Sequence, residues 1–201
     1  TGRTAVAVSA GERHTCAILD NGDLKCWGRD NHGQLGNGGT ITADQTSPPS
    51  TAIDLGTGRT AVAVSAGQYH TCAILDNGDM KCWGLDNYGQ LGNGVSNTEI
   101  HAPSTTAIDL GTGRTAVAVS AGIGHTCAIL DNGDMKCWGW DSNGQLGDGG
   151  TNTDKASPVA VSGSNTWDSS TGASSGSGSG SGSTTNVTGA TCSISPALPT
   201  G

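Results

Sequence analysis

Phenylalanine is absent from this 201-residue sequence, and aromatic residues make up only 3% of it. So few large apolar side chains cannot fill one large core, whereas 34 glycines suit short strands joined by many turns. Basic residues are also scarce: nine lysines and arginines face 17 aspartates and glutamates, which gives a formal net charge of −8. Because no basic stripe could neutralise phosphates, we expect no nucleic-acid partner. No apolar run approaches the roughly 18–20 residues that cross a bilayer, so we expect no membrane insertion.

The residue patterns of catalysis are missing as well. No Ser/His/Asp arrangement stands out from the abundant serines, and no two carboxylates stand apart as an acid/base couple. The Gly-Gln-Leu-Gly segments lack the lysine and the strand-to-helix context of a phosphate-binding loop, so their glycines are expected to satisfy turns. We therefore predict that the chain is not an enzyme and holds no cofactor. Calcium remains an alternative, because Asp20, Asn21, Asp23, Asp30 and Asn31 cluster oxygens, although their spacing does not match an EF-hand loop.

A repeated block dominates what is present. Residues 1–38 recur with five changes at 57–94, and a more diverged third copy spans 112–149. A period near 50 residues is typical of arrays such as propeller blades. Each copy contains four short strand candidates separated by Gly, Asn and Asp clusters, which in the first copy read TAVAVSAG, HTCAIL, LKCWG and STAIDLG. In the third copy, SPVAVSG takes the place of STAIDLG. The sequence predicts an all-β fold of three four-stranded antiparallel propeller blades, which form an incomplete ring.

Two cysteines lie ten positions apart in every copy. A three-residue hairpin loop with Gly22 in a left-handed conformation pairs residues whose numbers sum to 42, so that Cys16 faces Cys26 directly. A two-residue turn would instead place the two sulfurs on opposite faces. We predict the longer loop and three disulfides within the blades: Cys16–Cys26, Cys72–Cys82 and Cys127–Cys137.

Two alternatives for these cysteines remain open. They could be buried free thiols, or they could bind zinc together with the adjacent His14. Paired cysteines indicate an oxidising compartment, so the disulfide prediction favours an extracellular or cell-surface location. A seventh cysteine, Cys192, has no counterpart in the repeat.

The ordered motifs Val-Ser-Ala-Gly-x-x-His-Thr-Cys, Cys-Trp-Gly and Gly-Gln-Leu-Gly occur three times over residues 1–163. They closely resemble the regulator-of-chromosome-condensation (RCC1) repeat family, in the form common in bacterial and archaeal surface proteins. The resemblance implies a propeller of about seven four-stranded blades, so further blades, self-association or an open arc must accompany three copies. It also implies repeats at 1–56, 57–111 and 112–163. The best-known member is a guanine-nucleotide exchange factor that binds chromatin, but the acidic balance and paired cysteines argue against transferring that role.

The C-terminal part differs in composition. Residues 164–184 are rich in Ser and Gly and are expected to form a flexible linker. Residues 185–201 contain CSISPALPTG and resemble the opening of putative immunoglobulin-like domains of bacterial surface proteins, which implies a truncated β-sandwich. We therefore expect the chain to be a piece of a longer protein. Asn186 begins a sequon and is a candidate glycosylation site.

Positions that differ among the copies gather in two loops of each unit. Changing loop tips on a fixed scaffold is how repeat proteins build a binding face, with neutral drift as the alternative. The predicted binding face contains Arg13, Arg29, His32, Tyr69, Leu85, Tyr88 and Trp140.

Two residue types recur unchanged near these loops. The recurrent histidines are expected to hold a loop within their own blade, and the recurrent tryptophans to form a core between blades. They are His14, His70, His125, Trp27, Trp83 and Trp138.

These observations favour a noncatalytic scaffold that recognises a protein or carbohydrate ligand within a larger exported surface protein. Self-association to complete the propeller is compatible with three blades. One alternative is a guanine-nucleotide-exchange-factor-like regulator of a small GTPase, which predicts free thiols and a reducing compartment. Another is the noncatalytic part of an extracellular enzyme.

Overall fold

The computed structural model describes residues 2–39 and 44–163, and its regular elements there are all strands. No helix in this part of the chain is long and apolar enough to cross a membrane. The strands are β1 (Ala5–Ala10), β2 (His14–Leu19), β3 (Leu24–Gly28), β4 (Ala61–Ala66), β5 (His70–Leu75), β6 (Met80–Asp86), β7 (Thr98–Ile100), β8 (Ala116–Ala121), β9 (His125–Leu130), β10 (Met135–Gly139) and β11 (Lys155–Ala160).

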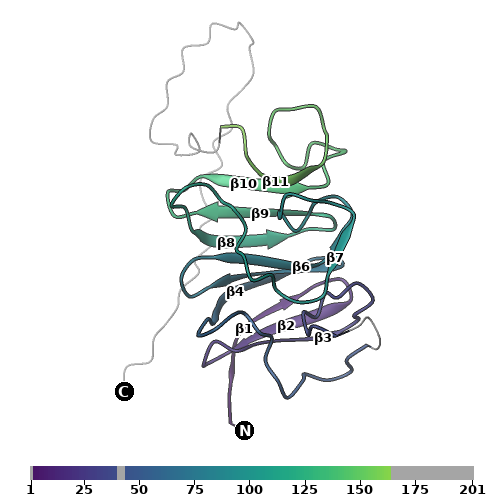
Figure 1. The fold of residues 1–201 in the computed structure, drawn as a ribbon, viewed down its shortest axis with the longest axis vertical. Helices are drawn as coiled ribbons and strands as arrows, with labels where there is room; N and C mark the ends of the chain where they lie inside the picture. Colours follow the sequence, from purple (N-terminus) through teal and green to yellow (C-terminus); the bar gives the residue numbers. More distant parts are fainter. Residues whose placement is uncertain (1, 40–43, 164–201) are drawn as a thin grey trace, which may run out of the picture. The chain divides into compact units, whose positions relative to one another are not determined.

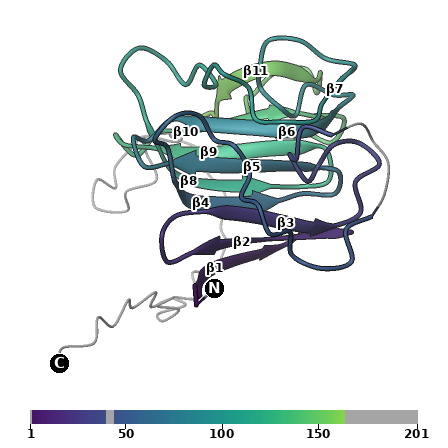
Figure 2. The same ribbon diagram turned by 60° about the horizontal axis from the view of Figure 1, so that its bottom comes forward.

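The strands form three antiparallel sheets that follow one another in chain order (Figure 1). Their orders are β1-β2-β3, β4-β5-β6-β7 and β11-β10-β9-β8, and we call them the first, second and third blades. In the first blade, the fourth position is occupied by a single bridge between Gly28 and Gln45. The opening strands β1, β4 and β8 lie in a row, each in contact with the next (Figure 2). The predicted all-β class and blade architecture are confirmed.

The hairpin between the second and third strand of each blade has the predicted register. Cys16 lies opposite Cys26, and the Leu19 N–H donates to the Asp23 carbonyl at 2.9 Å. Gly22 takes the left-handed conformation at φ 80°, which costs a glycine little. The structure forms all three predicted disulfides, each with Cα atoms 4.1 Å apart: Cys16–Cys26, Cys72–Cys82 and Cys127–Cys137.

The prediction that Ser-Thr-Ala-Ile-Asp-Leu-Gly closes the first two blades as a strand is wrong, whereas the segment predicted to close the third, Ser-Pro-Val-Ala-Val-Ser-Gly, overlaps a strand there. Residues 50–56 form no strand, and the fourth strands of the second and third blades are β7 and β11. Ile53 N–H makes one backbone bond, to the Leu24 carbonyl at 2.8 Å, while the Ile53 and Leu55 side chains are buried. The apolar alternation in this segment therefore reflects burial between blades and not pairing along a sheet edge.

The hydrophobic core lies between blades. One cluster joins Ile18, Leu24 and Leu35 of the first blade to Leu75 and Trp83 of the second. An equivalent cluster joins the second blade to the third. Thin sheets with few aromatic residues thus bury their apolar faces against each other, which explains how the chain folds without phenylalanine.

The tryptophans mark these junctions. Trp83 and Trp138 are fully buried, and their indole N–H groups donate to the backbone carbonyls of Gln34 and Gln90 in the preceding blade, at 3.0 and 2.9 Å. Gly36 lies so close that a Cβ there would stand 2.5 Å from the Trp83 indole nitrogen. The predicted role between blades is confirmed for both residues, whereas Trp27, on the outer face of the first blade, is only half-buried.

The blade limits at 56/57 and 111/112 stay predictions. The predicted linker, 164–184, and the predicted sandwich opening, 185–201, lie outside the described residues, as do Cys192 and Asn186.

We expect protein isolated from its native source to carry the three short-range disulfides. Peptide mapping under nonreducing conditions should recover linked peptides for Cys16–Cys26, Cys72–Cys82 and Cys127–Cys137, because each pair already faces across one hairpin. In the chain-entropy model, each short loop would contribute about 2–3 kcal/mol to the free energy of unfolding. Free thiols at all six positions would contradict the oxidising compartment.

Candidate binding surface

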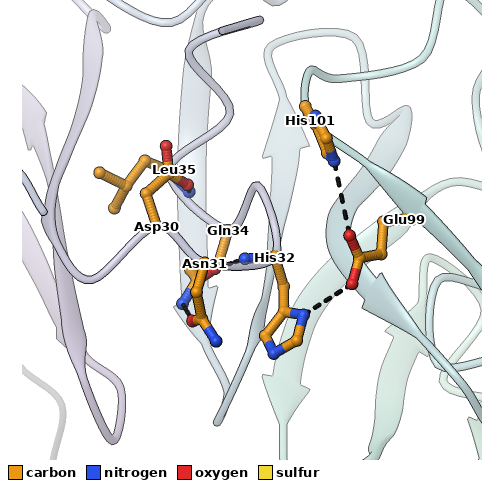
Figure 3. Close-up of polar contacts among 7 residues, drawn as sticks. All are labelled: Asp30, Asn31, His32, Gln34, Leu35, Glu99 and His101. Atoms are coloured by element: carbon orange, nitrogen blue, oxygen red, sulfur yellow. Dashed lines mark hydrogen bonds and ion pairs between the residues drawn. The ribbon is translucent and has the colours of Figure 1, made fainter. Parts of the chain in front are cut away.

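Two side chains that all three copies share, an Asp and a Gln, hold the loop that follows the third strand of each blade, and we call them the frame. In the first blade, the Asp30 carboxylate accepts the Leu35 N–H at 3.0 Å, and the Gln34 side-chain oxygen accepts the His32 N–H at 2.9 Å (Figure 3). The same two bonds recur in the other copies through Asp86, Gln90, Asp141 and Gln145. Because these bonds fix the backbone on both sides, the variable side chain at position 32, 88 or 143 is carried on a constant support.

Burial changes the pKa of the aspartate carboxylate in this frame. Burial raises the pKa of Asp30 and raises that of Asp86 to about 6, against the opposing effect of the backbone N–H groups of Leu35 and Leu91. The N–H groups of Leu35 and Leu91 favour the charged carboxylate because they donate hydrogen bonds to it.

The two variable loops of each blade lie side by side. The Arg29 N–H donates to the Arg13 carbonyl at 2.8 Å, and the Leu85 N–H donates to the Tyr69 carbonyl at 2.9 Å. In the third blade, the Trp140 N–H donates to the Gly124 carbonyl at 2.8 Å. Positions that are about 16 residues apart in the sequence thus form one patch at one end of each blade.

These patches also touch across the blade junctions. The His32 ring meets the Tyr69 ring edge-on with centroids 4.9 Å apart, and Tyr88 stacks on Trp140 at 5.5 Å. Gln68 of the second blade donates to the Glu12 carboxylate of the first. The predicted face is therefore continuous; we call it the loop strip, and it contains Glu12, Arg13, Arg29, His32, Gln68, Tyr69, Leu85, Tyr88, Glu99, His101 and Trp140.

At the two junctions of the strip, the larger side chain comes from opposite partners: from the following blade at the first and from the preceding blade at the second. At the first junction, Tyr69 fills the space beside the smaller His32. At the second, position 124 is glycine, and Tyr88 occupies that space, since a Cβ on Gly124 would stand 3.0 Å from the Tyr88 ring. Variation at one loop is therefore matched to variation at the neighbouring loop.

A carboxylate between two imidazoles closes the strip at the first junction. The Glu99 carboxylate in β7 contacts His32 Nδ1 at 2.7 Å and His101 Nε2 at 3.7 Å (Figure 3). All three side chains remain partly exposed. Among residues 2–39 and 44–163, no group of three or more His, Cys, Asp or Glu is placed to hold a metal ion. The contact with Glu99 therefore fixes the orientation of the His32 ring.

A shallow hollow of about 570 Å³ lies beside the strip, with Arg13, Arg29, Asn31 and Asp44 in its lining. The Arg13 side chain is 47% exposed and pairs with Glu12 at 3.1 Å. That hydrogen bond raises the pKa of Arg13, while contacts with Gln68 and Arg13 lower the pKa of Glu12. The site offers cationic, anionic and aromatic groups together, which suits noncovalent recognition.

The oxygen-bearing residues considered for calcium have other partners. Asp30 accepts from Leu35 and from Asn37 within its loop, and Asp20 pairs with Arg3 at 3.5 Å. Asn21 accepts the Asp23 N–H in the hairpin turn. These residues shape turns in the structure.

The prediction that each recurrent histidine holds a loop within its own blade is wrong. His14 Nε2 lies 2.7 Å from Thr71 Oγ1, and His70 Nε2 lies 3.0 Å from Thr126 Oγ1, in each case in the next blade. Because Thr71 donates its only hydroxyl proton to the Gln34 carbonyl at 2.8 Å, it accepts from the His14 N–H. The histidines therefore join blades, a relation over 56 or 57 residues that no local pattern reveals.

These junction histidines are neutral. His14 and His70 are buried, and neither Nδ1 atom has a hydrogen-bond partner in the described part of the chain. Burial lowers the pKa of His14 to about 4 and that of His70 to about 3, with the neighbouring histidines adding to the effect at His70.

Sequence comparison between copies missed part of the strip. Glu99 and His101 lie in a segment that does not repeat, so no internal comparison could select them. Glu12 and Gln68 did vary between copies, and the structure adds that they bond to each other. Asn186 lies outside the described residues.

Family models match most of the repeat region. A model described as the regulator of chromosome condensation (RCC1) repeat matches residues 5–34, 61–90 and 116–145, and a second with the same description matches 21–74 and 77–129.

Curated relatives match the same region. The ultraviolet-B receptor UVR8 of Arabidopsis thaliana is 33% identical over 156 residues, covering 77% of this chain and 33% of that protein. The secretion-regulating guanine nucleotide exchange factor of Mus musculus is 30% identical over 163 residues, covering 73% of this chain and 33% of that protein. The chain thus spans about a third of the length of these two relatives.

The fold matches a solved structure of Prp20p from Saccharomyces cerevisiae with a TM-score of 0.70 and 21% identity. The match covers 81% of this chain and 39% of Prp20p. At that identity the likeness shows the fold alone.

We expect His70→Gln to reduce the pH dependence of stability. The folded-state pKa of His70, about 3, lies below the unfolded value near 6.5, so stability is complete above about pH 6.5 and falls as the unfolded chain takes up protons. The variant should be about 1 kcal/mol less stable at neutral pH, through loss of a buried hydrogen bond. This deficit should vanish near pH 6 and change sign below it, because the wild-type chain alone loses about 1.4 kcal/mol per pH unit there.

Urea unfolding across this pH range measures the deficit. Asp86 acts with the opposite sign, since its raised pKa makes burial of the charged form costly above about pH 6, but it is common to both proteins and cancels in the difference. His125→Gln is the matched control, because His125 is only half-buried and has no blade beyond it in the described chain. An equal deficit at every pH would contradict a neutral buried imidazole.

Proposed function

Because the chain belongs to the regulator of chromosome condensation (RCC1) repeat family, we propose that it is a noncatalytic β-propeller scaffold that recognises a protein or carbohydrate ligand through its loop strip. The continuity of the loop strip carries this proposal. Backbone bonds join the two variable loops within each blade, and variable side chains touch across both junctions, while the frame beneath them is constant.

The chemistry of the strip favours recognition. Tyr and Trp offer flat apolar faces with a polar edge, and Arg offers several donors, which are the residue types that dominate binding energy at interfaces. Tyr88 and Trp140 stack on each other, and Tyr88 is 38% exposed, so the pair presents one aromatic surface. A sugar ring or an apolar side chain could lie on such a surface.

The disulfides support an exported, extracellular or cell-surface location for the protein. Three disulfides in about 160 residues stabilise thin sheets that have few large side chains. An extracellular or cell-surface location also agrees with the acidic composition of the chain.

An exchange-factor-like regulator of a small GTPase is the second candidate, favoured by the similarity to the mouse secretion-regulating exchange factor. It requires an intracellular location, where the six cysteines would be reduced. The thiol state of native protein therefore distinguishes the two functions.

Alanine substitutions in the strip test the proposal. We expect the combined Arg29→Ala, Tyr88→Ala and Trp140→Ala variant to bind at least about tenfold more weakly, equal to about 1.4 kcal/mol, to any ligand of the wild-type chain. The probes are an array of neutral and acidic oligosaccharides and an array of extracellular protein domains.

The matched control carries Thr57→Ala and Thr112→Ala. Both threonines are exposed and precede the opening strands, at the end of the blades away from the strip. Unchanged thermal unfolding of both variants shows that the fold is kept. Equal binding by the wild-type chain and the strip variant would show that another surface recognises the ligand.

A further inference from the structure

A pocket of about 340 Å³ lies at the junction between the second and third blades. One wall comes from the second blade and from the connection that follows it, with Leu91, Ile100 and Ile108. The other wall comes from the third blade, with Lys136 of β10 and Pro158 of β11. Its volume is at the lower end of the range of about 300–1,000 Å³ that is typical of small-molecule sites. None of its lining residues belongs to the loop strip, and we call it the junction pocket.

Backbone hydrogen bonds fix the segments that form the junction pocket. The Gly94 N–H donates to the Ala156 carbonyl at 2.9 Å and joins the loop after β6 to β11. The Ile108 N–H donates to the Met80 carbonyl at 2.9 Å and holds the connection against β6. Because these segments are already held in place, a ligand need not order them, which lowers the cost of binding.

Two opposite charges line the junction pocket without pairing with each other. The Asp109 carboxylate accepts the Gly111 N–H at 2.8 Å through one of its oxygens. The Lys136 ammonium also lies near this glycine, since a Cβ on Gly111 would stand 3.4 Å from its Nζ. Within the described residues, Lys136 has no hydrogen bond or ion pair, and Asp109 has no ion pair. Both charged groups are therefore available to the opposite charges of one ligand.

The first junction has an equivalent pocket without an available ammonium. Asp54 lines it in the place of Asp109. Lys81, the counterpart of Lys136, is buried and does not line it, and its ammonium donates to the Leu55 carbonyl at 2.9 Å. Lys81 also lines the junction pocket, with its ammonium held by that carbonyl. The repeat thus supplies an internal control, a pocket that has the acidic group and lacks the cation.

The remaining lining of the junction pocket suits an aliphatic body. Leu91 is buried, and Ile100, Ile108 and Pro158 are half-buried around it. Among the described lining residues, none is aromatic, so the pocket lacks the flat face on which a sugar ring could lie. A ligand that fits is therefore small, carries both signs of charge and has an aliphatic side chain.

We propose that the junction pocket binds a free aliphatic α-amino acid. The ligand carboxylate pairs with the Lys136 ammonium and the ligand ammonium with the Asp109 carboxylate, while the aliphatic side chain lies on Leu91, Ile100 and Ile108. A zwitterion has no net charge, so the net charge of −8 on the chain does not repel it. Burial of the aliphatic side chain supplies the hydrophobic part of the binding free energy.

Ligand analogues test the two charges without altering the chain. In isothermal titration calorimetry, L-leucine should bind at one site per chain with a Kd below about 1 mM. L-leucinamide lacks the carboxylate, and 4-methylpentanoate lacks the ammonium. Each analogue should bind at least about tenfold more weakly, because one charge of the pocket then has no partner.

Two variants locate the site in the chain. Lys136→Gln and Asp109→Asn should each weaken L-leucine binding at least about tenfold. Lys155→Gln is the matched control, because it removes the same charge from the same blade outside the pocket, where Lys155 pairs with Asp148 at 3.4 Å. The control should bind L-leucine as the wild-type chain does. Should either pocket variant fail to fold by circular dichroism, the analogues still decide the outcome.

Several results would overturn the proposal. An L-leucine titration without binding up to about 10 mM would leave the pocket without this ligand. Equal affinity for L-leucine and either analogue, or for the Lys136→Gln and Lys155→Gln variants, would remove the role of the paired charges. Two equal sites per chain would show that the ammonium of Lys136 is not required. The test does not depend on the ligand of the loop strip, because no substituted residue belongs to the strip.

Discussion

Two hydrogen bonds to one backbone carbonyl organise the repeat region. The carbonyl of Gln34 accepts from the Thr71 hydroxyl and from the Trp83 indole of the next blade, and the Gln90 carbonyl receives the same pair at the second junction. A carbonyl has two lone pairs, so it can satisfy both donors. Because Gln34 also holds the loop that carries His32, one residue fixes the distance between blades and the position of the binding surface together.

Because of this coupling, some residues must be the same in every copy, whereas others can differ between copies. The residues that the copies share make the frame, the hairpin disulfides and the junction bonds. The residues that differ stand on the frame and meet each other across the junctions, where a smaller side chain at one position is matched by a larger one at its neighbour. A repeat can therefore vary its surface without disturbing its core, which is how arrays of this kind acquire new ligands.

Local geometry made the hairpins predictable from the sequence, since loop length and Gly22 set the register that brings Cys16 to Cys26. The apolar alternation of residues 50–56 gave a wrong strand, because period-two burial also arises where a connection packs into a junction. The partner of His14 could not be predicted, since Thr71 belongs to another copy and only the packing of blades brings them together. Glu99 lies outside the repeat, so comparison between copies could not identify it.

The junction, more than the single blade, is the source of stability, and one pair of substitutions tests this directly. Trp83→Ala removes a fully buried indole and its bond to Gln34, whereas Trp27→Ala removes the same residue type at the same position of a blade with an open face. Urea unfolding at concentrations where the chain is monomeric should show a loss of about 3–5 kcal/mol for Trp83→Ala and about 1 kcal/mol for Trp27→Ala. Equal losses would mean that each blade is stabilised from within, and the account would be contradicted.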